Sequence, residues 1–364
     1  MLKVISTHEI AAGTRTLMYS GTPLVEHEGD LWITYALKAD GHVYLSRVMG
    51  DETVRVSHVA LEPGKDNVHW APAVGVWNGE LVVAYPERDA GHGCVRVPGK
   101  EPIDLACRIS MDYAFDGPWL HAAGALVGGD GFDWFRFGLA GVGRVVVNAR
   151  TIPGGYEQVE FRARAGRAVW LAVESPNQVR RGPLCAAEVS ESGRFRPLGS
   201  SAWESPPLDA QAARYRIFDG DVDMGSECSW DLDAAGGLVI ALKTPRTGRT
   251  VAGRCAWSQS PDDPRCDLRL WRDGEVGEPI PVWVRSWTNQ HPVVWGDKLL
   301  ATWGDYAAGA RADLHVWTGA TWLAVAGSGV IDAMVDYRLA DGRLALACWE
   351  RATGKLWVLI LEEE

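Results

Sequence analysis

The stretch Gly29-Asp30-Leu31-Trp32-Ile33-Thr34-Tyr35, with Gly41 ten residues after Leu31, decides the fold of this chain. The same frame recurs at Leu81, Leu238, Leu299 and Leu344, each with a Gly ten residues later. A further Gly lies two or three residues before each of these leucines: Gly29, Gly79, Gly236, Gly296 and Gly342. Gly supplies the positive φ of tight turns, and a short apolar run is typical of a strand covered on both faces. The frame therefore predicts a turn, a buried strand and a second turn in each copy.

A second frame follows the first. Asp267-Leu268-Arg269-Leu270-Trp271 is echoed 46 residues later by Asp313-Leu314-His315-Val316-Trp317, with weaker copies at 42–47 and 184–189. These segments are expected to supply the third and fourth strands of each unit. Four strands in about 45–60 residues is the period of a β-propeller, an all-β ring of four-stranded antiparallel blades. We expect residues 1–364 to form one such domain.

The turn glycines give the blade count. Gly131 and Gly166, added to the five above, make seven and predict seven blades. The spacing is irregular between Gly131 and Gly236, so six blades stay open. The last blade has too few strands of its own, and residues 2–10 are expected to close the ring as its outer strand. Only 208–213 resembles a helix, and it is short.

Composition narrows the function. The net charge of -11 argues against a nucleic-acid binder, and no apolar run is long enough to cross a membrane. The N-terminal residues lack the apolar core of a signal peptide, so we expect a soluble monomer, either cytoplasmic or exported or virion-associated by another route. Seven Cys without CxxC spacing predict buried free thiols, with a Cys255–Cys266 bridge left open. No cofactor is predicted, and a structural metal ion in the channel is left open.

The first strand of each propeller blade lines the central channel. Polar and aromatic residues just before or within those strands are therefore the candidate site, although each of them has a structural hydrogen-bonding role as its alternative. The ring so defined contains Asn67, His69, Trp70, Asp116, Trp119, His121, Asp221, Asp223, Glu227, Arg285, Trp287, Asn289, His291, Asp332, Asp336, Tyr337 and Arg338.

Two kinds of sugar chemistry fit these residue types. Glycoside hydrolysis needs two carboxyls about 5–10 Å apart, and the candidates are Asp221, Asp223, Glu227, Asp332 and Asp336. Elimination from a uronate needs a base, a proton donor and a cation for the carboxylate. The candidate bases are His69, His121 and His291, with Tyr337 as the donor and Arg285 or Arg338 as the cation. Asn67, Trp70, Trp119, Trp287 and Asn289 would bind the substrate, because indole faces stack on sugar rings.

The segments 67–85 and 290–303 share a polar or His residue, Pro, apolar residues, a turn and an apolar strand that ends in an aromatic. In this they resemble the sialidase-like, BNR-type propellers, which include sialidases and polysaccharide lyases of the ulvan-lyase kind. The sialidase Phe-Arg-Ile-Pro element and full Asp boxes are absent, and 318–322 is only a fragment of an Asp box. The resemblance implies an enzyme that cleaves a complex, possibly uronate-containing polysaccharide by elimination or hydrolysis, with lyase-like roles for His69, His291, Tyr337 and Arg338.

Two other classes remain as alternatives: a non-catalytic propeller that binds a glycan or a protein, and a phage or structural component. A lectin is expected to repeat near-equivalent pockets from blade to blade. The predicted ring differs from blade to blade, which favours a single site and hence an enzyme.

Overall fold

The computed structural model describes residues 2–15, 22–58, 63–64, 72–77, 79–87, 93–104, 113–116, 119–125, 132–138, 144–147, 156–164, 167–174, 181–190, 192, 194–205, 213–223, 228–245, 266–281, 292–303, 313–328, 333–350 and 353–364. Within these ranges every regular element is a β-strand except η1 (Ala213–Tyr215), a single 3-10 turn. No helix among them is long and apolar enough to span a membrane.

The described strands form seven antiparallel sheets. The first sheet consists of β2 (Leu24–His27), β3 (Asp30–Ala36), β4 (Val43–Arg47) and β5 (Thr53–Arg55). The second consists of β6 (Ala73–Trp77), β7 (Glu80–Pro86), β8 (Gly93–Arg96) and β9 (Ile103–Asp104). The third consists of β10 (Tyr113–Asp116), β11 (Trp119–Ala125), β12 (Phe132–Gly138) and β13 (Arg144–Val147).

The fourth and fifth sheets each carry an additional strand. The fourth consists of β14 (Tyr156–Arg164), β15 (Arg167–Glu174), β16 (Arg181–Val189) and β17 (Phe195–Pro197), with β18 (Arg216–Asp223) also paired to β16. The fifth consists of β19 (Ser229–Leu232), β20 (Leu238–Pro245), β21 (Cys266–Arg272) and β22 (Glu275–Val276), with β23 (Ile280–Pro281) also paired to β21.

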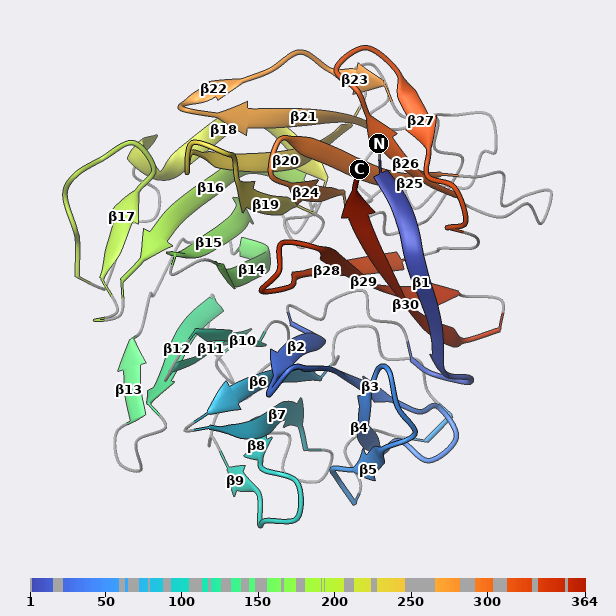
Figure 1. Ribbon diagram of the computed structural model, residues 1–364. Helices are drawn as coiled ribbons and strands as arrows, with labels where there is room; N and C mark the ends of the chain where they lie inside the picture. The colour runs from blue at the N-terminus through green and yellow to red at the C-terminus, as the bar shows by residue number, and fades with distance from the viewer. Residues whose placement is uncertain are drawn as a thin grey trace.

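The last two sheets bring the ends of the chain together. The sixth consists of β24 (Val293–Trp295), β25 (Lys298–Trp303), β26 (Asp313–Trp317) and β27 (Trp322–Ala324). The seventh consists of β28 (Ala333–Arg338), β29 (Leu344–Glu350), β30 (Lys355–Glu363) and, outermost, β1 (Leu2–Ala11). The sheets follow one another around a common centre, with their first strands nearest to it (Figure 1). The prediction of an all-β chain of four-stranded antiparallel sheets is confirmed.

The repeated leucine frame is the second strand of its sheet in all five copies, namely β3, β7, β20, β25 and β29. The preceding turn glycines have φ between 58° and 89°. This is the left-handed region that L side chains rarely adopt, which explains why Gly recurs there. The Asp-to-Trp frame is the third strand, β21 and β26, also as predicted.

The prediction that Gly131 precedes the second strand of a sheet is wrong. The first hairpin of the third sheet is instead formed by β10 and β11, in which Asp116 pairs with Trp119. Gly131 lies outside the described residues, between the second strand β11 and the third strand β12. The Gly-rich stretch 128–131 resembles the turn of the frame but lacks the Leu that follows it elsewhere. Trp119 and His121 are therefore on the second strand of their sheet rather than on the first.

Asp221 and Asp223 are also misplaced by the sequence frame. They were expected on the first strand before Gly236, but they lie on β18, which pairs with β16 of the fourth sheet. The first strand of the fifth sheet is the short β19 that follows. The error arises because the long interval from Gly166 to Gly236 contains this additional strand, which the frame does not signal.

The hydrophobic core lies between neighbouring sheets. Along β20, Leu238, Ile240 and Leu242 pack against residues of the fourth sheet, whereas Val239 and Ala241 pack against the sixth. This alternation is that of a strand buried on both faces, as the continuous apolar run predicts. The core is thus a series of interfaces between sheets, and apolar burial holds each sheet to its neighbours.

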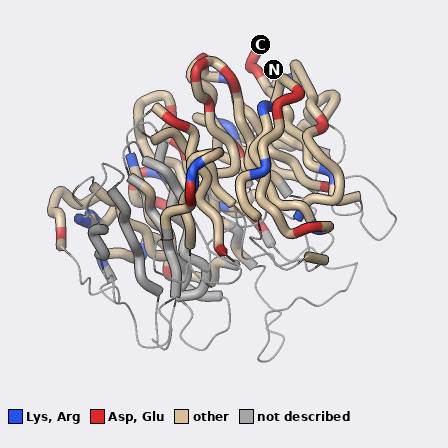
Figure 2. Tube along the Cα trace, turned by 90° about the horizontal axis from the view of Figure 1, so that it is seen from below, with Lys and Arg blue, Asp and Glu red and all other residues tan. Residues whose placement is uncertain are grey.

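The N-terminal strand pairs with the C-terminal strand, as predicted. β1 runs antiparallel to β30, from Leu2 opposite Glu363 to Ala11 opposite Leu356. Lys3 lies 3.1 Å from Glu362 and 2.7 Å from Glu364, and Lys298 lies 2.6 Å from Glu363. Figure 2 shows acidic and basic residues interspersed near the two termini.

Four described cysteines, Cys94, Cys185, Cys228 and Cys348, are buried free thiols, as expected. Burial raises the pKa of the Cys348 thiol, which keeps it protonated and unreactive. The alternative bridge cannot be placed, because Cys255 lies outside the described residues.

Candidate functional site

The first strands of the fifth and sixth sheets are joined by side chain to backbone hydrogen bonds. The Ser229 hydroxyl accepts from the backbone N–H of Val294 at 3.3 Å, and the Asp231 carboxylate accepts from that of Gly296 at 3.1 Å. Both partners lie 65 residues apart in the chain. Equal offsets mean that β19 and β24 run in the same direction, as neighbouring inner strands of a propeller do.

The carboxylate of Asp231 is buried and makes several polar contacts. Its side chain is only 2% exposed, and it also accepts from the backbone N–H of Leu232 at 2.8 Å. The guanidinium of Arg338, at the end of β28, lies 3.6 Å from the same carboxylate. The Arg338 side chain is 45% exposed, so one edge of its guanidinium faces solvent. A cation held in this way can bind a carboxylate of a ligand.

Tyr337, the residue before Arg338, joins the seventh sheet to the first. Its hydroxyl oxygen accepts from the backbone N–H of Glu26 at 3.0 Å. The Glu26 carboxylate in turn accepts from the backbone N–H of Ala340 at 2.7 Å. Burial raises the pKa of Tyr337, and the bond from Glu26 only partly opposes this. The phenol therefore keeps its proton at neutral pH.

Tyr337 and Arg338 face opposite sides of their sheet. Successive side chains of a strand alternate between its two faces. On β28, Val335 packs with the first sheet and Met334 with the sixth. Tyr337 follows Val335 in this pattern, whereas Asp336 and Arg338 follow Met334. Asp336 is 6% exposed. The structure thus brings Arg338 to Asp231 and Tyr337 to Glu26, and it separates the two from each other.

Most of the remaining candidates lie outside the described residues: Asn67, His69, Trp70, Glu227, Arg285, Trp287, Asn289, His291 and Asp332. All nine fall in stretches that lead from the outer strands of one sheet to the first strand of the next. Only the backbone is described for Asp116, Trp119, His121, Asp221 and Asp223. Asp116 ends β10 opposite Trp119, His121 pairs with Arg136, and Asp223 pairs with Arg181.

The sequence frame could have found Asp231. Asp231 lies five residues before Gly236, and Tyr337 lies five residues before Gly342, so the two are at equivalent places. We selected acidic residues further upstream of Gly236 and missed the one that the frame aligns with Tyr337. No feature of the sequence singles out Glu26. Its role depends on its contacts with Tyr337 and Ala340, which belong to another part of the chain.

Among the described residues, no group of three His, Cys, Asp or Glu side chains gathers as metal ligands would. The absence of a cofactor stays a prediction, and so does the possibility of a metal ion in the channel.

Comparison with known proteins places the fold. No protein-family model matches the chain, and no curated protein sequence matches it significantly. Solved structures do match over the whole length. The polysaccharide lyase Uly1 is 11% identical, with a TM-score of 0.61 over 100% of both chains. A PL25 ulvan lyase is 11% identical, with a TM-score of 0.62 over 99% of this chain and 96% of that chain.

A further structure is that of the PL25 ulvan lyase bound to -[GlcA(1-4)Rha3S]-, with a TM-score of 0.61 and 11% identity. At this identity the likeness shows the fold alone. The chain has the β-propeller fold, and among propellers it is similar to the ulvan lyases. The resemblance drawn from 67–85 and 290–303 is confirmed at the level of fold.

Proposed function

We propose that this protein is a polysaccharide lyase that acts on a uronate-containing glycan. The observation that carries the proposal is the likeness over the whole chain to three lyase structures, one of them bound to a glucuronate-containing saccharide. The polar and aromatic candidates that the sequence supplies are of the types that such chemistry needs. Hydrolysis of the same class of glycan is the second outcome that the substrate test distinguishes.

We also propose that the seven sheets form a complete, closed ring. The seven described sheets are the seven blades, and β1 closes the ring as the outer strand of the last blade. Two observations support this: the pairing of β1 with β30, and the contacts of Tyr337 with Glu26 that join the last sheet to the first. A closed ring buries the facing surfaces of the last blade and the first against each other.

The site lies at the face where the inner strands begin. Inner strands that run in one direction receive their preceding connections at the same end. The connections into β6, β19, β24 and β28 contain Asn67, His69, Trp70, Glu227, Arg285, Trp287, Asn289, His291 and Asp332. We assign the site to these residues, with His121, which pairs with Ala114 near the start of β10, as a further candidate. Trp119 pairs with Asp116 at the end of β10 and is therefore not assigned to this face.

The chemistry is an elimination. A histidine, His69 or His291, removes the proton from the carbon next to the uronate carboxylate. The bond from the sugar to the leaving oxygen breaks, the leaving oxygen takes up a proton, and a carbon–carbon double bond forms. Arg285 neutralises the carboxylate through paired N–H groups, which favours the developing negative charge. Trp70 and Trp287 stack on neighbouring sugar rings.

We do not assign Tyr337 and Arg338 to the chemistry of the lyase site, although the sequence predicted such roles for them. They end β28, five and six residues after Asp332, which is about 16–20 Å along a strand at 3.3 Å per residue. They also face opposite sides of the sheet. We therefore assign them to holding the inner strands together, and we assign Asp336, on the same strand and buried, likewise.

A substrate screen tests the proposal. Purified protein is incubated with a panel of uronate-containing polysaccharides, and both the ultraviolet absorbance of unsaturated ends and the new reducing ends are followed. A lyase raises both signals together. Reducing ends without the absorbance would replace elimination by hydrolysis. No product on any glycan, with sugar binding intact, would leave a glycan-binding propeller instead.

A further inference from the structure

A groove between the fourth and fifth sheets contains an arrangement that the proposed lyase site does not use. It has a volume of about 480 Å³ and is lined by Arg167, Glu188, Arg196, Ser200, Trp271 and Asp273, among others. Volumes of this size hold small organic ligands such as one or two sugar units. The groove lies beside the turn after β19, whereas the connection with Glu227 precedes β19. The two are therefore at opposite ends of that strand.

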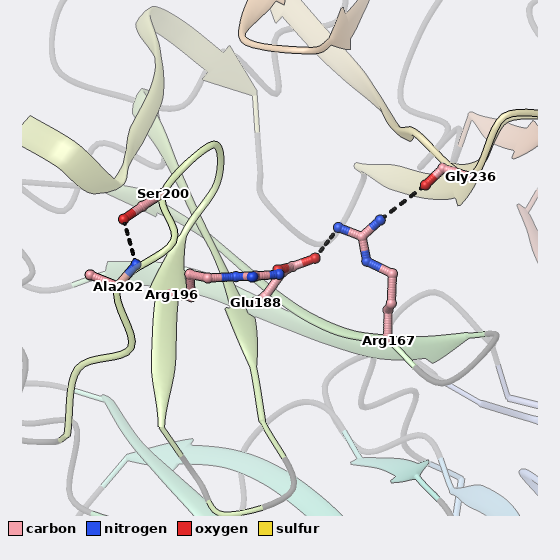
Figure 3. Close-up of polar contacts among 6 residues, drawn as sticks. All are labelled: Arg167, Glu188, Arg196, Ser200, Ala202 and Gly236. Carbon is pink, nitrogen blue, oxygen red and sulfur yellow. Dashed lines mark hydrogen bonds and ion pairs between the residues drawn. The ribbon is translucent and has the colours of Figure 1, made fainter.

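Two arginines in the groove share one carboxylate. The guanidinium groups of Arg167 and Arg196 each donate to a different oxygen of Glu188 (Figure 3). The Glu188 side chain is 7% exposed, and each arginine side chain is 32% exposed. One negative charge thus faces two positive charges, and both arginines line the groove.

Both guanidiniums are held in place by further contacts. Arg167 donates to the backbone carbonyl of Gly236, 3.2 Å away in the fifth sheet. The guanidinium carbon of Arg196 lies 4.7 Å from the ring centre of Trp203. Burial, and to a smaller extent the nearby charge of Arg196, lower the pKa of Arg167. Two fixed, partly desolvated guanidiniums form a preorganised site for an oxyanion.

The neighbouring groove serves as an internal comparison. Between the fifth and sixth sheets, a groove of about 470 Å³ is lined by Arg272, Asp297, Lys298 and Trp317, among others. Trp271 and Trp317 occupy equivalent positions on the third strands of their sheets. There, however, each cation has its own carboxylate: Arg272 lies 3.3 Å from Asp297, and Lys298 lies 2.6 Å from Glu363. Two arginines that share one carboxylate are therefore a feature of the first groove and not a general property of the repeat.

The rim of this groove offers a ligand a carboxylate and an indole ring in addition to the arginines. Asp273 is exposed at the tip of the β21–β22 hairpin, so solvent screens its charge from the arginines. An exposed carboxylate accepts hydrogen bonds from sugar hydroxyls, and the buried Trp271 supplies an apolar wall. A cationic back wall with a hydroxyl-accepting rim fits an acidic sugar better than a neutral one or an isolated inorganic anion.

We propose that this groove is a second glycan-binding site, which takes the carboxylate or sulfate group of an acidic sugar on the guanidiniums of Arg167 and Arg196. It lies at the end of the sheets opposite to the proposed lyase site, and it binds without turnover. The proposal goes beyond the proposed activity and does not depend on it.

The test is a titration followed by ligand-detected NMR. Methyl glucuronide carries the carboxylate, glucose 6-sulfate carries the sulfate, and methyl glucoside is the neutral reference. We expect at least one acidic probe to bind, and Arg167→Gln and Arg196→Gln each to weaken it by about tenfold, since each removes a charge-assisted hydrogen bond. Glu188→Gln tightens binding several-fold, because it removes the competing carboxylate. Arg272→Gln, in the neighbouring groove, leaves it unchanged.

Each outcome decides one point. Binding of only one acidic probe identifies the group that is recognised. Folding of each variant is verified by thermal unfolding. If binding survives both arginine variants, or if the affinity is unchanged in Glu188→Gln, the three residues only stabilise the fourth sheet and its contact with the fifth. Polysaccharide cleavage by Arg196→Gln at the wild-type rate, with the acidic probe no longer bound, separates this site from the lyase site.

Discussion

Arg338 of the seventh sheet and Asp231 of the fifth sheet form a 3.6 Å ion pair, although the sixth sheet lies between theirs in the chain. The two partners differ in burial, since the Asp231 side chain is 2% exposed and that of Arg338 is 45% exposed. The carboxylate also accepts two backbone N–H groups. One buried carboxylate therefore joins the inner strands of three sheets.

This arrangement predicts unequal effects of its two partners on stability. Asp231→Ala leaves two partly buried N–H groups without this acceptor, which costs about 1–3 kcal/mol. Arg338→Gln removes a half-exposed charge and costs less than about 1 kcal/mol, as exposed ion pairs do. Urea unfolding of the single and double variants measures both. A larger loss from Arg338→Gln than from Asp231→Ala would contradict the picture of a carboxylate held mainly by the backbone.

The β1–β30 pairing predicts that the first strand stabilises the seventh sheet. Removal of residues 2–11 uncovers the edge of β30, which then pairs with other chains or lets the last sheet fray. We expect a lower melting temperature, broadened unfolding and association, measured by calorimetry and gel filtration. A peptide of residues 2–11 added in trans is expected to reverse this association. A truncated chain that melts like the full one would show that β1 contributes little.

The surroundings of Tyr44 predict that its hydroxyl loses its proton at a higher pH than a free phenol does. Burial, followed by donation of its hydroxyl to the Asp40 carboxylate at 2.6 Å, raises the pKa of Tyr44 to about 12. The unfolded value is about 10, so the folded protein holds this proton more tightly. Its contribution to the free energy of unfolding is complete below about pH 10 and is lost as the pH rises towards about 12.

The measurement is the phenolate absorbance of the wild type minus that of Tyr44→Phe. Asp40→Asn is expected to lower the pKa of Tyr44, because the acceptor loses its charge, while burial keeps the pKa above 10. If the hydrogen bond to Asp40 had no influence, the pKa of Tyr44 would be the same in Asp40→Asn as in the wild type.

The leucine frame was sufficient for most of the fold because it marks a physical requirement. A strand buried on both faces needs a continuous apolar run, and the turn before it needs a residue at positive φ, as at Gly29 and Gly342. Where that requirement is met in another way, the frame fails. The first hairpin of the third sheet is formed by β10 and β11, ahead of the expected turn, and β18 adds a strand within an interval that the frame treats as a connection.

The candidate site was predicted less well, for a related reason. Residue type and distance from a turn Gly place a side chain along a strand, but the partner on the next sheet decides its role. Arg338 and Tyr337 were correctly placed on an inner strand, yet their contacts are Asp231 and Glu26, neither of which the sequence singled out. The Arg167, Glu188 and Arg196 cluster shows the same limit, because its members are drawn from three strands.

The central claim is elimination from a uronate-containing glycan at the face where the inner strands begin. The most direct measurement is the ultraviolet absorbance of unsaturated product released from such a polysaccharide by the wild type, His69→Ala, His291→Ala and His315→Ala. His315, on the third strand β26, is the matched control. We predict product from the wild type and from His315→Ala, and a loss of at least about 100-fold in His69→Ala or His291→Ala with the fold intact. Wild-type rates in both of these variants, or no unsaturated product from the wild type on any uronate polysaccharide, would contradict the account.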